Sequence, residues 1–187
     1  MNISKVKRLI ILLMFRLTDG HGRYKLAKKL KLFNRIGHTC YLGSYNFGTE
    51  PFLISFGDNV VLGTGVRFIN HDMSAEMISL KVNSKFDGLS LFGEIVVGDN
   101  VFIGADSIIL PGVTIGNNVV IGAGAIISND IPSDGVYVGT GRYIKSFQEY
   151  ASGVIEASNK IRTTMVSEHL VDNGFCLRKK GDARRLN

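Results

Sequence analysis

A repeat of six residues restricts the fold of this chain more than any other feature of its sequence. An aliphatic residue returns at every sixth position, six times in succession, at Val97, Ile103, Ile109, Ile115, Ile121 and Ile127. An amphipathic helix repeats every three to four residues and a half-buried strand alternates strictly, so neither explains this period. A short strand joined to a tight corner does explain it, and three such units make one triangular turn.

A second series of small or β-branched residues runs at the same interval, at Val101, Ser107, Val113, Val119, Ala125 and Ile131. Glycine follows the repeat aliphatic in four units, where the backbone must bend with no Cβ in the way. Asn100 and Asn118 occupy corner positions where a left-handed backbone is tolerated. We therefore expect both series to point inward and to fill the interior with stacked side chains.

A second copy of the pattern lies upstream, with Phe56, Leu62 and Phe68 at the repeat position. The stretch from Phe56 to Val97 is more than twice as long as the single turn that should join them. The sequence therefore predicts an insertion of about residues 74–94 that leaves the coil and returns in register.

This pattern resembles the hexapeptide-repeat acetyltransferases, most of all the sugar and capsular-polysaccharide O-acetyltransferases and the maltose and galactoside acetyltransferases. Residues 48–55, GTEPFLIS, are similar to an EP-x-L-I-S stretch that precedes the catalytic turn in polysaccharide acetyltransferases. The resemblance implies a mainly β fold, a left-handed parallel β-helix built from three flat sheets.

The chain divides by pattern into three parts. We expect a helical cap over residues 1–35, with helices at 4–17 and 22–33, and the β-helix over residues 36–141. Residues 142–187 are expected to form a C-terminal helix, followed by a basic tail. Ser146 and Glu149 have the spacing of a capping box, which predicts the start of that helix.

Charge is segregated along the chain. Residues 1–35 contain ten Lys and Arg against one acidic residue, whereas residues 36–141 contain three against ten. Nucleic-acid binding is disfavoured because there is no basic stripe interleaved with aromatic residues and no recognisable binding module. Anionic lipid headgroups or cofactor phosphates fit basic ends better. Two interpretations of the N-terminal helices stay open: they cap the prism, or they attach it to a membrane surface.

The N-terminus begins like a signal peptide but lacks its length. The apolar run at residues 9–15 is followed by no small-x-small cleavage site, and a spanning helix needs about 20 apolar residues. Cys40 and Cys176 have neither metal nor redox spacing and are expected to be free thiols. These features predict a cytoplasmic protein, at the inner face of the membrane if the helices bind lipid.

His71 is the candidate catalytic residue. It lies in the motif FINHD, on a repeat turn immediately before the insertion. The resemblance implies that this histidine is the catalytic base. A sugar hydroxyl attacks poorly until its proton is removed, and imidazole, with an ordinary pKa near ~6.5, can accept that proton at neutral pH.

Acidic and amide side chains accompany this histidine in the sequence. Either Glu50 or Asp72 could fix its tautomer or bind acceptor hydroxyls, and Asn70 is a candidate acceptor ligand. The remaining histidines have no comparable setting. The repeats after Phe56 contain a single histidine, so the three-histidine zinc site of a metal hydratase is not expected, and we predict no metal.

The resemblance implies acetyl-CoA as the donor, bound in the groove between two prisms of a homotrimer. Ala105 and Ala123 lie one full turn apart, directly stacked, at the positions that meet pantetheine in the family. Ser128 and Asn129 match a polar pair before the family's D-I-P motif. Arg142 and Lys145 are candidate cations for the CoA phosphates, although the proline of the family's G-x-P-A-K-x-I-K stretch is missing here.

These expectations converge on an acetyl-CoA-dependent O-acetyltransferase that acts on a sugar or polysaccharide precursor. No cysteine or serine lies in a nucleophile motif, so an acyl-enzyme is not expected. The alternatives are an N-acetyltransferase of a nucleotide-linked amino sugar, a non-catalytic β-helix scaffold, and a membrane-associated adaptor.

Overall fold

The computed structural model describes residues 11, 13–82 and 91–163. The chain divides into two compact units, the first ending at Lys145 and the second beginning at Ser146. The first unit contains almost all of the strands, and the second contains one described helix.

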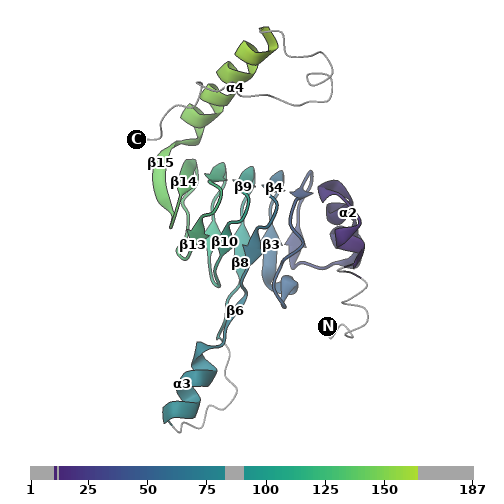
Figure 1. Ribbon diagram of the computed structural model, residues 1–187, viewed down its shortest axis with the longest axis vertical. Helices are drawn as coiled ribbons and strands as arrows, with labels where there is room; N and C mark the ends of the chain where they lie inside the picture. The colour runs from purple at the N-terminus through teal and green to yellow at the C-terminus, as the bar shows by residue number, and fades with distance from the viewer. Residues whose placement is uncertain (1–10, 12, 83–90, 164–187) are drawn as a thin grey trace. The chain divides into compact units, whose positions relative to one another are not determined.

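Three sheets run along the first unit, which we name A, B and C (Figure 1). Sheet A contains β1 (Arg35–Ile36), β3 (Ile54–Phe56), β8 (Ile95–Val97) and β11 (Thr114–Ile115). Sheet B contains β2 (Tyr41–Leu42), β4 (Val60–Leu62), β9 (Val101–Ile103), β12 (Val119–Ile121), β14 (Gly135–Val138) and β15 (Arg142–Ser146). Sheet C contains β5 (Arg67–Phe68), β10 (Ile108–Ile109) and β13 (Ile126–Ile127).

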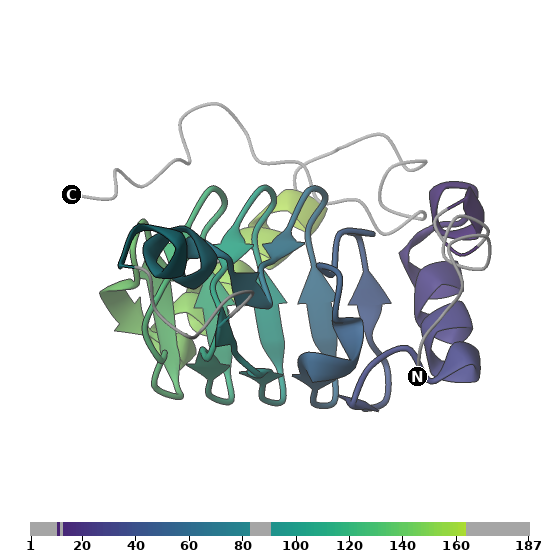
Figure 2. The same cartoon turned by 90° about the horizontal axis from the view of Figure 1, so that it is seen from below.

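Pairing within the regular part of these sheets is parallel and joins residues one full turn apart. Val101 pairs with Val119 in sheet B, Ile109 with Ile127 in sheet C, and Val97 with Ile115 in sheet A. The chain therefore visits one sheet after another and returns one turn further along, as the stacked strands of Figure 2 show. The predicted parallel β-helix is confirmed.

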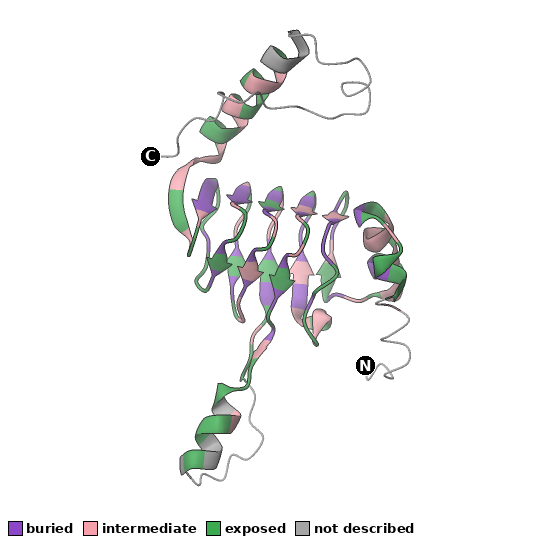
Figure 3. Cartoon of the chain, in the orientation of Figure 1, coloured by how far each residue is buried: buried purple, intermediate pink, exposed green. Residues whose placement is uncertain are grey.

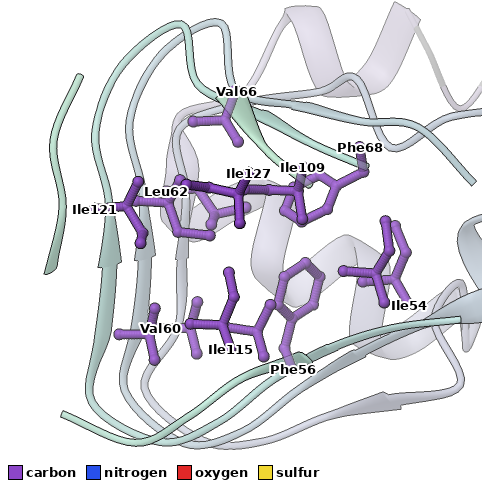
Figure 4. Packing of buried hydrophobic residues seen from close by; sticks show 14 of the residues in the cluster. Ile54, Phe56, Val60, Leu62, Val66, Phe68, Ile109, Ile115, Ile121 and Ile127 are labelled. Atoms are coloured by element: carbon purple, nitrogen blue, oxygen red, sulfur yellow. The ribbon is translucent and has the colours of Figure 1, made fainter. Parts of the chain in front are cut away.

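Both inward series predicted from the sequence are buried (Figure 3). The repeat aliphatics stack in columns through the interior, among them Ile109 beside Ile127 and Leu62 near Ile121 (Figure 4). Burial of one such side chain contributes roughly 1.5–3 kcal/mol. Ser107 is the polar member, and its hydroxyl donates to the carbonyls of Gly104 and Gly122 at 2.8 and 3.1 Å. The interior tolerates this hydroxyl because both of its partners are backbone oxygens.

One corner of the prism is lined by a ladder of amide side chains. Asn59, Asn100, Asn118 and Asp134 all have a positive φ of 54–64°. Each Asn Nδ2 donates to the Oδ1 of the next member, over 3.0, 3.0 and 2.8 Å. Asparagine tolerates the left-handed conformation better than other residues with a Cβ, so backbone preference and side-chain bonding favour the same residue here.

The first turn is wider than the others. Ile36 pairs with Phe56 across a longer stretch of chain than a regular turn contains, and five buried phenylalanines fill the extra space. Phe47 lies at their centre, stacked on Phe68 with ring centroids 5.8 Å apart and in edge contact with Phe15 and Phe33. Phe33 and Phe47 thus pack on Phe56 and Phe68, the repeat residues of the next turn.

The helix α2 (Gly20–Leu30) lies against β2 at the start of the prism (Figure 1). The Asp19 carboxylate accepts the Gly22 N–H at 2.7 Å, and Lys31 ends the helix in a left-handed conformation. The Arg23 guanidinium donates to the carbonyls of Phe15, Leu42 and Gly43. Of the predicted helix at 4–17, residues 11 and 13–16 are described as helical.

The described residues of the insertion form two strands and a helix. β6 (His71–Asp72) and β7 (Leu91–Phe92) form an antiparallel pair that leaves the prism, and α3 (Ser74–Val82) follows β6 (Figure 1). The chain then re-enters sheet A with Phe56 paired to Val97, so the predicted return in register is confirmed. The sequence predicted an insertion without internal strands, because neither of these short strands has a detectable period.

The C-terminal part differs from expectation at its start. Residues 142–146 form β15, which joins β14 at the edge of sheet B, instead of leading straight into a helix. α4 (Phe147–Thr163) follows, and the predicted capping box forms: Glu149 Oε2 accepts the Ser146 N–H at 2.9 Å and Ser146 Oγ accepts the Glu149 N–H at 3.2 Å. The basic tail and Cys176 lie outside the described residues.

Within the described part of the chain, no helix combines the length and the hydrophobicity needed to cross a bilayer. Cys40 is a free thiol with no exposed surface, and this burial raises its pKa.

The amide ladder makes a prediction about stability. Asn100→Ala removes both side-chain bonds and leaves a residue with a Cβ at a φ of 57°, so we expect a loss of about 1–3 kcal/mol in the free energy of unfolding. Asn100→Gly removes the same bonds but relieves the backbone strain, and it should cost less. Urea denaturation followed by circular dichroism measures both variants. Equal losses in the two variants would contradict the role of the left-handed corner.

Candidate active site

His71 lies where the chain leaves the prism. It follows β5 of sheet C, it begins β6, and it pairs with Phe92 of β7. Its ring is 5.6 Å from the Phe92 ring, centroid to centroid, and 27% of its side chain is exposed. The imidazole is therefore packed on one side and open to small molecules on another.

Glu50 reaches His71 from the preceding turn of the coil. Its Oε2 lies 2.9 Å from His71 Nδ1, and 19% of its side chain is exposed. The Thr49 hydroxyl donates to the same carboxylate oxygen at 2.6 Å and lies 3.2 Å from His71 Nδ1. The carboxylate and the hydroxyl thus converge on one ring nitrogen.

This arrangement determines which nitrogen of the ring can act as a base. An ionised carboxylate has no hydrogen to donate, so the Glu50 contact favours the tautomer in which His71 Nδ1 carries the proton. Nε2 then keeps a free lone pair, directed away from Glu50. An imidazole held in this tautomer can remove a proton from a bound hydroxyl, and the carboxylate stabilises the imidazolium that forms.

Asp72 has a different position from Glu50. Its Oδ1 accepts the backbone N–H of Ser74, the first residue of α3, at 2.8 Å, and its side chain is exposed. The pKa of the Asp72 carboxyl is lowered, first by that backbone hydrogen bond and then by the Ser74 hydroxyl, with His71 a minor cause. Of the two acids proposed from sequence, Glu50 is therefore the one in contact with the imidazole.

A pocket of about 330 Å³ opens beside this pair. Its lining comes from two segments of chain: Asn46, Gly48, Thr49, Phe68, Ile69, Asn70 and His71. Asn70, the candidate acceptor ligand, is only 1% exposed, and its amide atoms are buried without a hydrogen-bond partner among the described residues. Thr49 was not singled out in the sequence, although it directly precedes Glu50 in the EP-x-L-I-S stretch.

Register brings two of the donor candidates to the end of sheet C that carries Ile69 and Asn70. Phe68, Ile109 and Ile127 are paired across sheet C, so Asn129 continues the column of Asn70, two turns along. Ser128 and Asn129 are both exposed at this corner, where their side chains lie 3.2 Å apart. Successive parallel strands are about 4.8 Å apart, so the pair lies on the order of 10 Å from the position of Asn70.

Ala105 and Ala123 lie at the opposite border of sheet C. The Gly124 N–H donates to the Ala105 carbonyl at 2.8 Å, and a Cβ on Gly104 would overlap the Ala123 nitrogen, so the two alanine turns are stacked tightly. The Ile126 N–H donates to the Gly139 carbonyl at 2.8 Å, which continues this corner by one turn. Arg142, exposed, and Lys145, half-buried, follow that turn in β15.

Among the residues that the structure describes, no group of three His, Cys, Asp or Glu side chains could hold a metal ion. His38 and His21 belong to other parts of the fold: His38 is on the first turn, where its backbone N–H bonds Asp58, and the His21 ring contacts Tyr41. His169 lies outside the described residues.

Comparison with known proteins identifies the family. Residues 94–129 match the family model for the bacterial transferase hexapeptide, six repeats. Protein CapG of Staphylococcus aureus is 44% identical over 131 residues, which span 67% of this chain and 73% of CapG. The galactoside O-acetyltransferase of Lactococcus lactis is 31% identical over 150 residues, which span 68% of this chain and 69% of that enzyme. This chain belongs to the hexapeptide-repeat acetyltransferases.

A solved structure of the same family supports the architecture. A galactoside acetyltransferase in complex with coenzyme A superposes with a TM-score of 0.57 at 25% sequence identity, covering 79% of this chain and 82% of that chain. The family resemblance drawn from the six-residue period is thus confirmed, and as a member of this family the chain is an acyltransferase.

Proposed function

We propose that this acetyltransferase moves the acetyl group of acetyl-CoA to a hydroxyl of a sugar or polysaccharide precursor, with His71 as the general base. The observation that supports this most strongly is the Glu50–His71 contact of 2.9 Å at the mouth of an open pocket. The galactoside O-acetyltransferase among its relatives supports a sugar hydroxyl as the acceptor.

In the proposed mechanism, Glu50 and Thr49 hold the imidazole with Nδ1 protonated, and Nε2 takes the proton of the acceptor hydroxyl. The acceptor oxygen bonds to the carbonyl carbon of the acetyl thioester, and the bond from that carbon to sulfur breaks. The proton on Nε2 then passes to the departing sulfur, so His71 ends the cycle neutral. The Glu50 carboxylate stabilises the transient imidazolium. The role of Asp72 in this scheme is to fix the turn from β6 into α3, and the acceptor-binding role of Asn70 stays a prediction.

We place the donor along the sheet C face of the prism. Ala105 and Ala123 offer a small-residue border past which a pantetheine chain can run, and Ser128 and Asn129 offer polar atoms at the other border. Arg142 and Lys145 supply the cations for the phosphates. Coenzyme A in the solved galactoside acetyltransferase supports this choice of donor.

Two finer features of the proposal rest on the family alone: the left-handed sense of the coil and a homotrimer in which the donor lies between two prisms. Exposed apolar side chains on the outer faces of the prism are compatible with subunit packing. They are Val96, Phe102 and Ile126, each 38–46% exposed and each from a different sheet.

One prediction of this mechanism concerns the base. His71→Ala should lower kcat for acetyl transfer by about 10²–10⁴-fold, because a general base contributes that much, and Glu50→Gln should give an intermediate loss. His38→Ala is the matched control, since the described bonds of His38 are made by its backbone. Thiol release from acetyl-CoA is measured with a panel of acceptors, and product mass spectrometry distinguishes O- from N-acetylation.

Near-normal turnover in His71→Ala would contradict the mechanism. Binding of CoA with no acetyl transfer to any acceptor would instead support the non-catalytic scaffold. The circular dichroism spectrum of each variant must match the parent chain for either conclusion.

A second prediction concerns the donor. Arg142→Ala should weaken CoA binding about tenfold or more, because a charge-assisted hydrogen bond to phosphate is worth roughly 1.5–3 kcal/mol. Lys25→Ala on α2 removes the same charge at the other end of the prism and should leave binding unchanged. Isothermal titration calorimetry measures both, and an unchanged affinity in Arg142→Ala would remove this residue from the proposed donor site.

We also propose that the N-terminal cap binds an anionic membrane surface from the cytoplasmic side. Three large apolar side chains are exposed on the first helical segment and the turn that ends it, beside the exposed Arg16: Leu13, Met14 and Leu17 are 57%, 44% and 77% exposed. Cations that are exposed on the cap accompany them: Lys25, Lys28, Lys29, Lys31 and Arg35. Each cation near an anionic bilayer contributes about 1 kcal/mol, so apolar insertion and charge act together.

Vesicle flotation tests this attachment. The full chain should float with phosphatidylglycerol vesicles and not with neutral phosphatidylcholine vesicles, and high salt should weaken binding. Leu13→Ser combined with Leu17→Ser should release the protein, whereas Lys81→Ala on α3 should not. Failure to float with anionic vesicles would leave the cap with a structural role alone.

A further inference from the structure

Two segments of the chain run side by side and line the pocket: residues 46–50 and residues 67–71. Asn46 forms a parallel bridge with Arg67, and the Phe68 N–H donates to the Asn46 carbonyl at 3.3 Å. The Phe47 and Phe68 rings are stacked at an interplanar angle of 25°. The pairing ends at the Glu50–His71 contact, so the relative position of the two segments determines the geometry of that contact.

Gly48 and Asn70 face each other in the middle of this pairing. Gly48 has a φ of 70°, and a Cβ built on it would overlap Asn70 Oδ1 and lie 3.0 Å from the Phe68 carbonyl oxygen. No side chain fits in that space. The turn that leads to Thr49 and Glu50 therefore lies directly on the Asn70 amide.

The side-chain amide of Asn70 fills the space beside Gly48 and makes no hydrogen bond with the described residues. Its Oδ1 and Nδ2 are both buried and unpartnered within the described part of the chain, while its backbone carbonyl accepts the Gly93 N–H at 2.9 Å. An unpaired buried amide is unfavourable, and an apolar side chain of similar size would avoid that cost. Features with such a local cost are concentrated at functional sites.

We propose that Gly48 and Asn70 are positioning residues for the catalytic pair. Asn70 is anchored by its backbone to the base of the insertion, and its planar amide limits how closely the Gly48 turn approaches residues 67–71. The separation between the Gly48 turn and residues 67–71 sets the distance from Thr49 and Glu50 to His71 Nδ1. Only glycine permits it, because any Cβ at position 48 would occupy the volume of the Asn70 oxygen.

The expected change in kcat rests on the proposed function. The expected change in the position of Glu50 relative to His71 does not. A direct measure of that geometry is the tautomer of His71, which the ¹⁵N shifts of the ring nitrogens report. The parent chain should show the proton on Nδ1, because Glu50 accepts it there.

Gly48→Ala should move the Thr49–Glu50 turn away from His71, so the Nδ1–H tautomer should be lost. The kcat should fall roughly 10–100-fold with little change in KM, because a misplaced catalytic group affects the chemical step. Gly112→Ala is the matched control: Gly112 has a φ of 81°, but a Cβ there would meet no atom within 4 Å. It introduces the same kind of backbone strain without the clash and should leave the tautomer unchanged.

A second substitution separates the clash from the strain. Asn70→Ala in the Gly48→Ala background removes the oxygen that the new Cβ would meet, so the Nδ1–H tautomer should return at least in part. Thermal unfolding of each variant shows whether a change in stability accompanies the change in tautomer.

The inference is overturned if Gly48→Ala keeps the Nδ1–H tautomer, if Gly112→Ala loses it to the same extent, or if the double variant shows no recovery. These outcomes are distinguishable from failure of the proposed function. If only the proposed function fails, His71→Ala keeps its turnover, while the tautomer of His71 in the parent background still responds to Gly48→Ala.

Discussion

Registered stacking of one turn on the next is the constraint on which the rest of the structure depends. Each turn hydrogen-bonds to its neighbours through three sheets, and its inward side chains extend the columns of the turn before. A residue's place along the prism therefore follows from its position in the six-residue unit. This is why Asn129, far from Asn70 in sequence, occupies the same column two turns further along. Ser128 and Asn129 therefore lie at the same end of sheet C as Asn70, the residue before His71.

The proposed catalytic groups lie where this regularity fails. The first turn is longer than the others, and the second turn is followed by an insertion between Phe68 and Val97. Glu50 belongs to the first irregularity and His71 begins the second, and stacking brings them together. A perfectly periodic prism presents the same side chains on every turn. A unique site needs a departure from the period, and here two departures on adjacent turns form one pocket.

Much of the fold could be predicted from the sequence, because a period repeated over several units averages out local exceptions. The inward columns, the return of the insertion in register and the Ser146–Glu149 capping box all follow from spacing alone. The contents of the insertion could not be predicted, since β6 and β7 are too short to show a period and β15 has no repeat of its own. Spacing also left Glu50 and Asp72 equivalent as partners of His71. The two differ in their contacts in the folded chain. Glu50 reaches His71 from the neighbouring turn of the coil, whereas the carboxylate of Asp72 accepts the backbone N–H of Ser74. The burial of Asn70 has no signal in the sequence.

The guanidinium of Arg23 has a consequence for the protein as a particle in solution. A stack of identical turns has no intrinsic reason to end, and its last strand offers unpaired backbone groups to any similar strand nearby. At the start of this prism, the Arg23 guanidinium donates hydrogen bonds to the carbonyls of Leu42 and Gly43. α2 packs against β2, the strand that leads into them. One arginine thus occupies backbone oxygens that a strand of another molecule could otherwise bond, which opposes end-to-end polymerisation into filaments.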